Sequence, residues 1–157
     1  MKKLILLSLL MVSGMTFASE QPDHSIFDRF LNKYVSSTGK VNYKGMKTQM
    51  DSLDAYITEL RGTFPSSDWG RNAKKAYYCN AYNAYTLKLV LVKYPLNSVK
   101  DASFSGKDLW SVKLVKLGDK TFTLAHVENE ILRKMKDPRI HFAINCASYS
   151  CPRIWNH

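Results

Sequence analysis

Residues 71–94 read RNAKKAYYCNAYNAYTLKLVLVKY, and this stretch decides the fold. It contains no proline before Pro95, and proline cannot continue a helix, so the sequence predicts one long helix over most of the stretch. Its second half, residues 84–92, is apolar on nearly every side except at Lys88. A helix that is apolar all round belongs in the interior of a domain, so we expect the other elements to pack around it.

The segments on either side predict shorter elements. Three more helices are predicted from apolar residues at helical spacing, each with a cap or stop signal: residues 25–35 after Asp23 and Ser25, residues 48–61 before Gly62, and residues 125–136 after Thr123. Strands are predicted where the pattern alternates: residues 40–43, residues 112–114 and 122–124 around a turn at Leu117-Gly118-Asp119-Lys120, and residues 140–146. The predicted class is therefore α+β, a mostly helical single domain in which a long central helix packs on a small β-sheet.

Length and composition agree with one folded domain. The chain has 157 residues, of which 45% are hydrophobic and 12% aromatic, which excludes a disordered chain. Its length argues against two full domains, since one domain takes about 100–150 residues.

Residues 1–18 have the pattern of a signal peptide that is removed on export. Lys2 and Lys3 precede an apolar core at residues 4–12, and Thr16-Phe17-Ala18 supplies small residues at the two positions that a signal peptidase reads. The stretch is too short to span a membrane, which takes about 20 residues. We therefore predict an exported protein, periplasmic or secreted after cleavage near Ala18, with residues 19–157 as its single domain and no transmembrane segment in the mature chain.

The charge gives little indication of a partner. The full chain has a formal charge of +10, and removal of Lys2 and Lys3 leaves 21 basic and 13 acidic residues, a net charge of +8. The lysines are scattered and no block of five like charges occurs, so we expect an ordinary solvated surface. Nucleic acid is not an expected partner, and an anionic surface of the cell envelope is the alternative that the charge leaves open.

The segment with the most chemistry is residues 141–152, HFAINCASYSCP. In an oxidising compartment Cys146 and Cys151 are expected to form a disulfide that fixes the shape of the loop. The alternative is a nucleophilic cysteine, Cys146 or Cys151, with His141 as its base. In a regular strand His141 shares a face with Asn145 and not with Cys146, so Cys151 would have to fold back toward it. His126 is another candidate base.

A metal site is not expected in this segment. His141, Cys146 and Cys151 supply three ligands where a structural zinc site uses four, and export favours oxidation of the thiols. We predict no metal and no other cofactor.

A second group of polar residues lies inside the long helix. Asn80 and Asn83 are three positions apart and so are neighbours on one face. They have two alternative roles: to orient a catalytic histidine or bind the polar groups of a ligand, or to tie the helix to nearby backbone, which buried amides commonly do. We favour the second. Cys79 is predicted to be a small buried thiol that faces away from Asn80.

Three stretches of the sequence resemble a known family: residues 78–84 (YCNAYNA), residues 118–133, and above all residues 137–152 (DPRIHFAINCASYSCP). They are similar to the domain of unknown function 547 family, over roughly residues 28–152. The resemblance implies a mostly helical α+β domain that is often exported in bacteria, and it brings no established activity. The residues that match the motifs of the family are Asn80, Asn83, His141, Asn145, Cys146, Ser148 and Cys151.

The sequence departs from the family pattern in two places. Tyr78-Cys79-Asn80 stands where the family usually has Trp-Ile-Asn. The family domain usually continues through further helices after the Cys-Pro pair, whereas this sequence stops at His157, so we expect a member that is shortened at its C-terminus.

Two functional hypotheses follow from these residues. The first is a binding or structural module with a Cys146–Cys151 disulfide loop and binding residues Asn80, Asn83, Asn145 and Ser148. The second is a cysteine-dependent hydrolase or acyl transferase, with Cys146 or Cys151 as nucleophile, His141 as base, and Asn80 or Asn145 as the orienting group. The sequence does not indicate the ligand or substrate.

Overall fold

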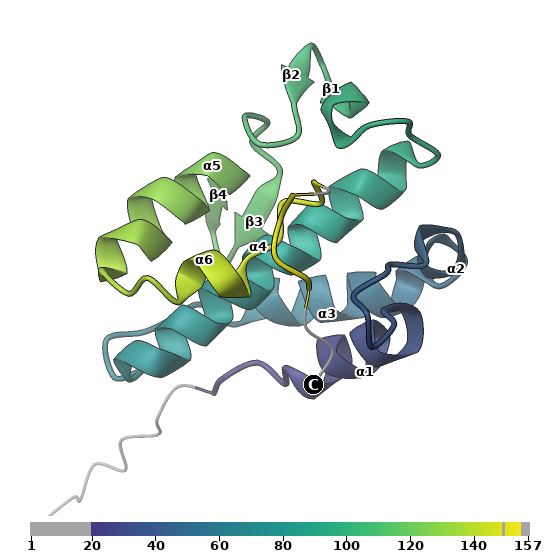
Figure 1. Ribbon diagram of the computed structural model, residues 1–157. Helices are drawn as coiled ribbons and strands as arrows, with labels where there is room; N and C mark the ends of the chain where they lie inside the picture. The colour runs from purple at the N-terminus through teal and green to yellow at the C-terminus, as the bar shows by residue number, and fades with distance from the viewer. Residues whose placement is uncertain (1–19, 149, 155–157) are drawn as a thin grey trace, which may run out of the picture.

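The computed structural model describes residues 20–148 and 150–154 (Figure 1). The predicted signal peptide, residues 1–18, lies outside the described residues, so export stays a prediction. Within the described part of the chain helices predominate and the strands form two antiparallel pairs, which confirms the mostly helical α+β class. None of the helices described has the length and apolarity that crossing a membrane requires.

Helix α4, Arg71–Lys93, forms the centre of the fold as predicted. It follows Gly70 and ends before the Tyr94–Pro95 peptide bond. Residues 77–91 are buried except at Asn80 and Lys88, and the fully buried side chains include those of Tyr77, Tyr82 and Leu91. In Figure 1 it crosses the molecule as the long teal helix.

Between residue 20 and α4 the chain forms three helices: α1 (Ser25–Tyr34), α2 (Tyr43–Lys47) and α3 (Met50–Gly62). The cap of α1 predicted at Asp23 or Ser25 is wrong, because the N-cap position is His24 and its side chain makes no cap hydrogen bond. Asp23 still lies at the start of the helix, where its Oδ1 accepts a hydrogen bond of 2.9 Å from the Ser25 backbone N–H. The predicted strand at residues 40–43 reduces to a single bridge between Val35 and Val41. Asn42 caps α2 through its side chain, so the chain turns into a helix where a strand was expected.

Helix α3 packs along α4 and fixes one wall of the core. The buried Tyr77 hydroxyl on α4 donates a hydrogen bond of 2.7 Å to the Leu60 carbonyl of α3. Lys88, the one charged residue in the apolar half of α4, pairs with Asp54 of α3, with Nζ and Oδ1 2.6 Å apart. The lysine expected to interrupt the apolar surface is thus neutralised by the neighbouring helix.

The strands follow α4 and a short helical turn, η1 (Val99–Asp101). Strands β1 (Ser103–Phe104) and β2 (Lys107–Asp108) form one pair, and β3 (Val115–Leu117) and β4 (Lys120–Phe122) form the other. The predicted turn at Gly118 and Asp119 is confirmed, with the strands shifted inward from the predicted ranges. The Tyr85 hydroxyl donates a hydrogen bond of 2.6 Å to the Lys116 carbonyl, which ties β3 to α4.

A continuous helical segment then packs on the other side of α4. It consists of α5 (Leu124–His126), the wider turn η2 (Val127–Leu132) and η3 (Arg133–Met135). Thr123 caps it as predicted, because its hydroxyl accepts a hydrogen bond of 2.9 Å from the His126 backbone N–H. The segment ends at Lys136, which adopts a left-handed conformation with φ of 50°.

The strand predicted at residues 140–146 is wrong. Ile140–Ala143 form helix α6, and the chain becomes extended only at Ile144. The Asp137 side chain accepts a hydrogen bond of 3.1 Å from the Arg139 backbone N–H and so starts a helical turn. In a strand Phe142 would share a face with the buried Ile140, whereas in helix α6 it has 68% of its surface exposed.

Candidate functional site

Asn83 on α4 acts as a clamp on the segment after α6. Its Nδ2 donates to the Ala143 carbonyl at 2.9 Å, and its Oδ1 accepts from the Asn145 backbone N–H at 2.8 Å. The two backbone groups flank Ile144, so the Asn83 amide pairs with this segment as the backbone of a neighbouring β-strand would. Asn83 is only 6% exposed, so its polar atoms have to find partners within the protein. Asn83 thus takes the predicted role of tying the helix to nearby backbone.

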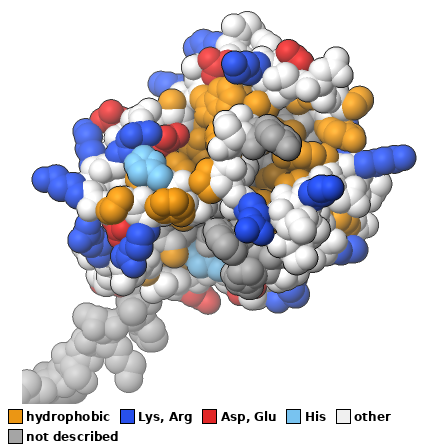
Figure 2. Space-filling view, in the orientation of Figure 1, with side chains coloured by type: hydrophobic (Ala, Val, Ile, Leu, Met, Phe, Trp, Pro, Cys, Tyr) orange, Lys and Arg blue, Asp and Glu red, His pale blue; other side chains and the backbone are white. Residues whose placement is uncertain are grey.

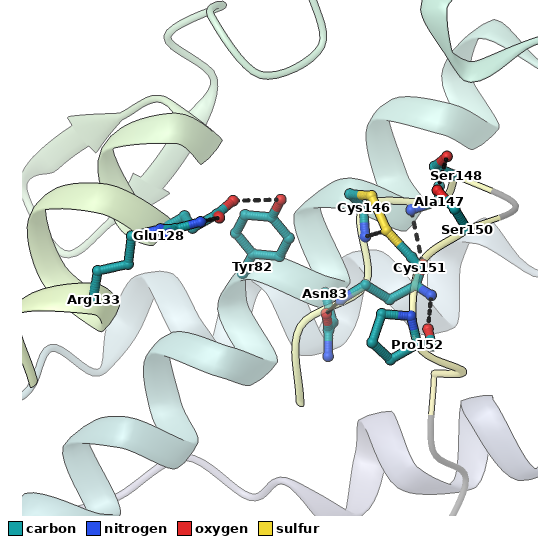
Figure 3. Close-up of a disulfide and its surroundings, with 11 residues drawn as sticks. Tyr82, Asn83, Glu128, Arg133, Cys146, Ala147, Ser148, Ser150, Cys151 and Pro152 are labelled. Carbon is teal, nitrogen blue, oxygen red and sulfur yellow. Dashed lines mark hydrogen bonds and ion pairs between the residues drawn. A yellow bond between two sulfur atoms is a disulfide. The ribbon is translucent and has the colours of Figure 1, made fainter. Parts of the chain in front are cut away.

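The disulfide loop follows directly from this clamp (Figure 3). Cys146 and Cys151 are bonded to each other, with Cα atoms 6.3 Å apart, so the predicted bridge is confirmed. Asn145 closes the same loop a second time, because its Nδ2 donates to the Pro152 carbonyl at 2.5 Å and its Oδ1 accepts from the Ala147 N–H at 2.8 Å. The loop is therefore held both by a covalent bond and by the amide of the residue before it.

Ser148 lies in the part of the loop that Figure 3 shows farthest from Asn83. Its hydroxyl is 3.3 Å from that of Ser150. The four predicted binding residues therefore divide: Asn83 and Asn145 bond to backbone, Ser148 contacts a neighbouring hydroxyl of the loop, and Asn80 lies elsewhere.

His141 lies exposed on α6. The expected strand face shared with Asn145 does not exist, because His141 is in a helical turn and Asn145 follows in extended backbone. Both sulfurs of the loop belong to the disulfide, so neither cysteine carries a thiol that His141 or His126 would deprotonate in this form. The nucleophilic role stays a prediction for the reduced chain.

Asn80 lines two adjoining clefts on the N-terminal half of α4. Their volumes are about 480 and 420 Å³, and they share Cys79, Asn80 and Ala143. Because they share these three lining residues, we name the two together the cleft, with an acidic lobe that contains Asp28 and a basic lobe that contains Lys75 and Arg139. Within the described part of the chain the Asn80 side chain makes no hydrogen bond, although the residue is half-buried. One turn further along α4, both the Nδ2 and the Oδ1 of Asn83 are hydrogen-bonded.

The acidic lobe lies between α4 and the start of α1, where it is lined by His24, Asp28, Asn80 and Asn83. Asp28 is half-buried and makes no ion pair with a described residue. The Nδ1 atom of His24 is 2.6 Å from the Tyr56 hydroxyl. Burial lowers the pKa of His24, although Asp23 opposes the shift, so the ring is neutral at pH 7. Asp28 therefore carries the formal charge of this lobe.

The basic lobe lies between α4 and α6, where Asn72, Lys75, Asn80 and Arg139 contribute its polar groups. Asp137 pairs with both cations: Lys75 Nζ contacts its Oδ2, and Arg139 reaches both oxygens, at 2.9 Å from Nε and 2.7 Å from Nη2. These hydrogen bonds from Arg139 and Lys75 hold the pKa of Asp137 well below its usual range. One carboxylate thus pairs with two cations, so the group keeps a net positive charge.

Cys79 forms part of the floor that the two lobes share. It is 7% exposed, and burial raises the pKa of its thiol to about 11. The thiol is therefore protonated and a poor nucleophile at neutral pH, as expected for a small buried cysteine.

Comparison with known proteins places this site within a family. The family described as "Protein of unknown function, DUF547" matches residues 66–156, more than half of the chain. The chain belongs to the DUF547 family. No curated protein and no solved structure matches it. The DUF547 match contains α4, α6, the disulfide loop and all the residues named in the basic lobe, whereas His24 and Asp28 of the acidic lobe precede it.

Sequence reasoning missed four charged or titratable residues of the cleft: His24, Asp28, Lys75 and Arg139. A signal existed for the first two, because they are four positions apart at the start of a predicted helix and hence on one face. Arg139 lies inside the longest DUF547 motif, directly after Asp137 and Pro138. Lys75 had no signal in the sequence, because only the fold brings it to Asp137.

Proposed function

We propose that this DUF547 protein is a binding module whose ligand lies in the cleft over Asn80. The observation that carries the proposal is the contrast between two asparagines on one face of α4. Both polar ends of Asn83 are bonded to backbone, whereas the amide of Asn80 makes no hydrogen bond with a described residue and borders both lobes. A half-buried amide in a cleft gains most from a ligand that supplies the missing partners.

The disulfide loop serves as the support of this cleft. Ala143, which lines both lobes, is held by Asn83, and the backbone two residues later enters the loop. Because the loop is closed by a covalent bond, moving Ala143 away from α4 would cost free energy. The cleft therefore keeps its shape without a ligand. Binding sites that are already formed lose less free energy to ordering when the ligand arrives.

The cysteine-dependent hydrolase or acyl transferase requires a reduced loop. Its nucleophile would come from breaking the Cys146–Cys151 bond, and His141 would then have to approach from the exposed face of α6. The binding module needs neither change, and for this reason it is the function that we propose.

The experiment is a titration of the full chain with small ligands, in which NMR detects binding. Tri-alanine, glucose and succinate represent a peptide, a sugar and a dicarboxylate, each added at millimolar concentration. We expect at least one of them to shift the backbone amide signals of Cys79, Asn80 and Ala143, and we expect Asn80→Ala to abolish that shift.

Asn32→Ala is the matched control, since Asn32 is an exposed asparagine on α1 that borders neither lobe. The control must bind as the wild type does. If none of the three probes moves the signals of Cys79, Asn80 and Ala143, or if Asn80→Ala leaves the shifts unchanged, the proposed function is wrong.

A further inference from the structure

The two lobes of the cleft carry opposite charge. Asp28 is the only lining residue of the acidic lobe, among those described, with a formal charge at neutral pH, because burial keeps His24 neutral. Lys75 and Arg139 line the basic lobe, whereas Asp137, their shared partner, is not among its lining residues. A ligand that fills both lobes therefore meets a negative group at one end and positive groups at the other.

The basic lobe has capacity for a further anion. Arg139 has 79% of its side chain exposed even though it pairs with Asp137, so its guanidinium keeps donors that face solvent. Lys75 is 14% exposed, and its Nζ contacts Asp137 and lies 3.5 Å from Asn72 Oδ1. A carboxylate that enters this lobe would pair with a group whose net charge is positive, and it would displace no existing protein partner from Arg139.

The spacing along α4 sets the length of the ligand. On this helix Lys75 is the charged residue of the basic lobe and Asn83 lines the acidic lobe. Their separation of eight positions corresponds to about 12 Å at about 1.5 Å per residue. An extended peptide rises about 3.3 Å per residue, so three or four residues cover that distance. Asn80 lies between these two residues, where its amide is able to donate to and accept from a peptide backbone.

We infer that the cleft binds a short zwitterionic peptide of three or four residues. Its α-ammonium group lies in the acidic lobe beside Asp28, its backbone pairs with Asn80, and its terminal carboxylate lies in the basic lobe beside Arg139 and Lys75. The inference rests on the proposed function and deepens it, because it names the class of ligand and its direction in the cleft.

The test compares four probes by calorimetric titration of the full chain: tri-alanine, N-acetyl-tri-alanine, tri-alanine amide and free alanine. Blocking either terminus removes one charge, and we expect each block to weaken binding about tenfold, the effect of one charged hydrogen bond. Free alanine is too short to reach both lobes, and we expect it to bind more weakly than tri-alanine.

Two variants test which lobe binds which terminus of the peptide. In Asp28→Asn we expect tri-alanine and its acetylated form to bind equally, because the acidic lobe has lost its charge. In Arg139→Gln we expect a smaller difference between tri-alanine and its amide, because Lys75 remains. Asp51→Asn and Arg61→Gln change the same residue types on α3, away from both lobes, and must keep both differences.

The possible failures are distinguishable. If tri-alanine binds but blocking its termini has no effect, or if the two variants change nothing, the zwitterionic peptide is overturned. If glucose or succinate shifts the signals around Asn80 and tri-alanine does not, the peptide is again wrong while the binding module stands. If tri-alanine binds without any effect of Asn80→Ala, both proposals fail.

Discussion

Two regions on one face of α4 use the same residue type in opposite ways. At Asn83 both polar atoms of the side chain bond to the backbone around Ile144, next to a disulfide loop that is closed twice. At Asn80, three positions earlier, the amide borders a cleft and has no partner among the described residues. The same residue type on one helix thus serves the fold at Asn83 and is left open to a ligand at Asn80, and the hydrogen bonds of the two amides distinguish these roles.

The difference between Asn83 and Asn80 has its largest expected effect on the free energy of unfolding. Asn83→Ala leaves the Ala143 carbonyl and the Asn145 N–H without their partner, and we expect it to lower the free energy of unfolding by about 3 kcal/mol. We expect Asn80→Ala to change it by less than about 0.5 kcal/mol. Both variants replace Asn by Ala within one helix, so the difference in helix propensity cancels. Urea unfolding measures both values, and an equal loss in the two variants would contradict the assignment.

The disulfide loop gives the next largest effect. Cys146 and Cys151 are five positions apart, and the loss of loop-closure entropy for so short a ring corresponds to about 2 kcal/mol. We therefore expect the double variant Cys146→Ala with Cys151→Ala to be less stable by that amount. Cys79→Ala is the matched control for a change of cysteine, and reductant should destabilise it as it does the wild type. A double variant as stable as the wild type would show that the loop does not support the fold.

Asp137 connects the basic lobe to the stability of the fold, with a smaller effect that depends on pH. Its pKa is lowered in the folded chain, so the unfolded chain takes up a proton first as the pH falls. The contribution of Asp137 is therefore complete above its unfolded pKa of about 3.9 and is lost as the pH drops below that value.

We expect Asp137→Asn to make the unfolding free energy less dependent on pH below about 4. Asp119→Asn, in the turn between β3 and β4, is the control and should keep the slope of the wild type. Chemical denaturation at several acidic pH values measures the slope. An unchanged slope in Asp137→Asn would mean that the pairs with Lys75 and Arg139 do not form.

The smallest effect concerns the reactivity of Cys79, which lines both lobes of the cleft. Because burial raises its pKa to about 11, we expect the native, unreduced chain to react slowly with iodoacetamide at pH 7 and faster as the pH approaches 11. Reduction should add two thiols, which intact mass measures directly. Rapid alkylation of Cys79 at neutral pH would show that the floor of the cleft opens readily.

The sequence was most informative where one pattern covers many residues. The absence of proline and the apolar second half predicted α4, and the Cys146–Cys151 spacing together with predicted export indicated the disulfide. Residues 140–146 were misread because an alternation over so few residues also fits a helical turn. The decisive contact there is local, between the Asp137 side chain and the Arg139 backbone. The cleft could not be predicted, because Asp28 and Asn80 lie far apart in the sequence and only the packing of α1 near α4 brings them to one lobe.

Asn83 is committed to the fold, whereas Asn80 is available to a ligand. Hydrogen exchange of the two side-chain amide groups, followed by NMR with and without tri-alanine, tests this difference most directly. We predict slow exchange at Asn83 in both conditions, fast exchange at Asn80 in the free protein, and a shift at Asn80 alone when tri-alanine is added. Equal protection of the two amides in the free protein, or a response to tri-alanine at Asn83 without one at Asn80, would contradict the claim.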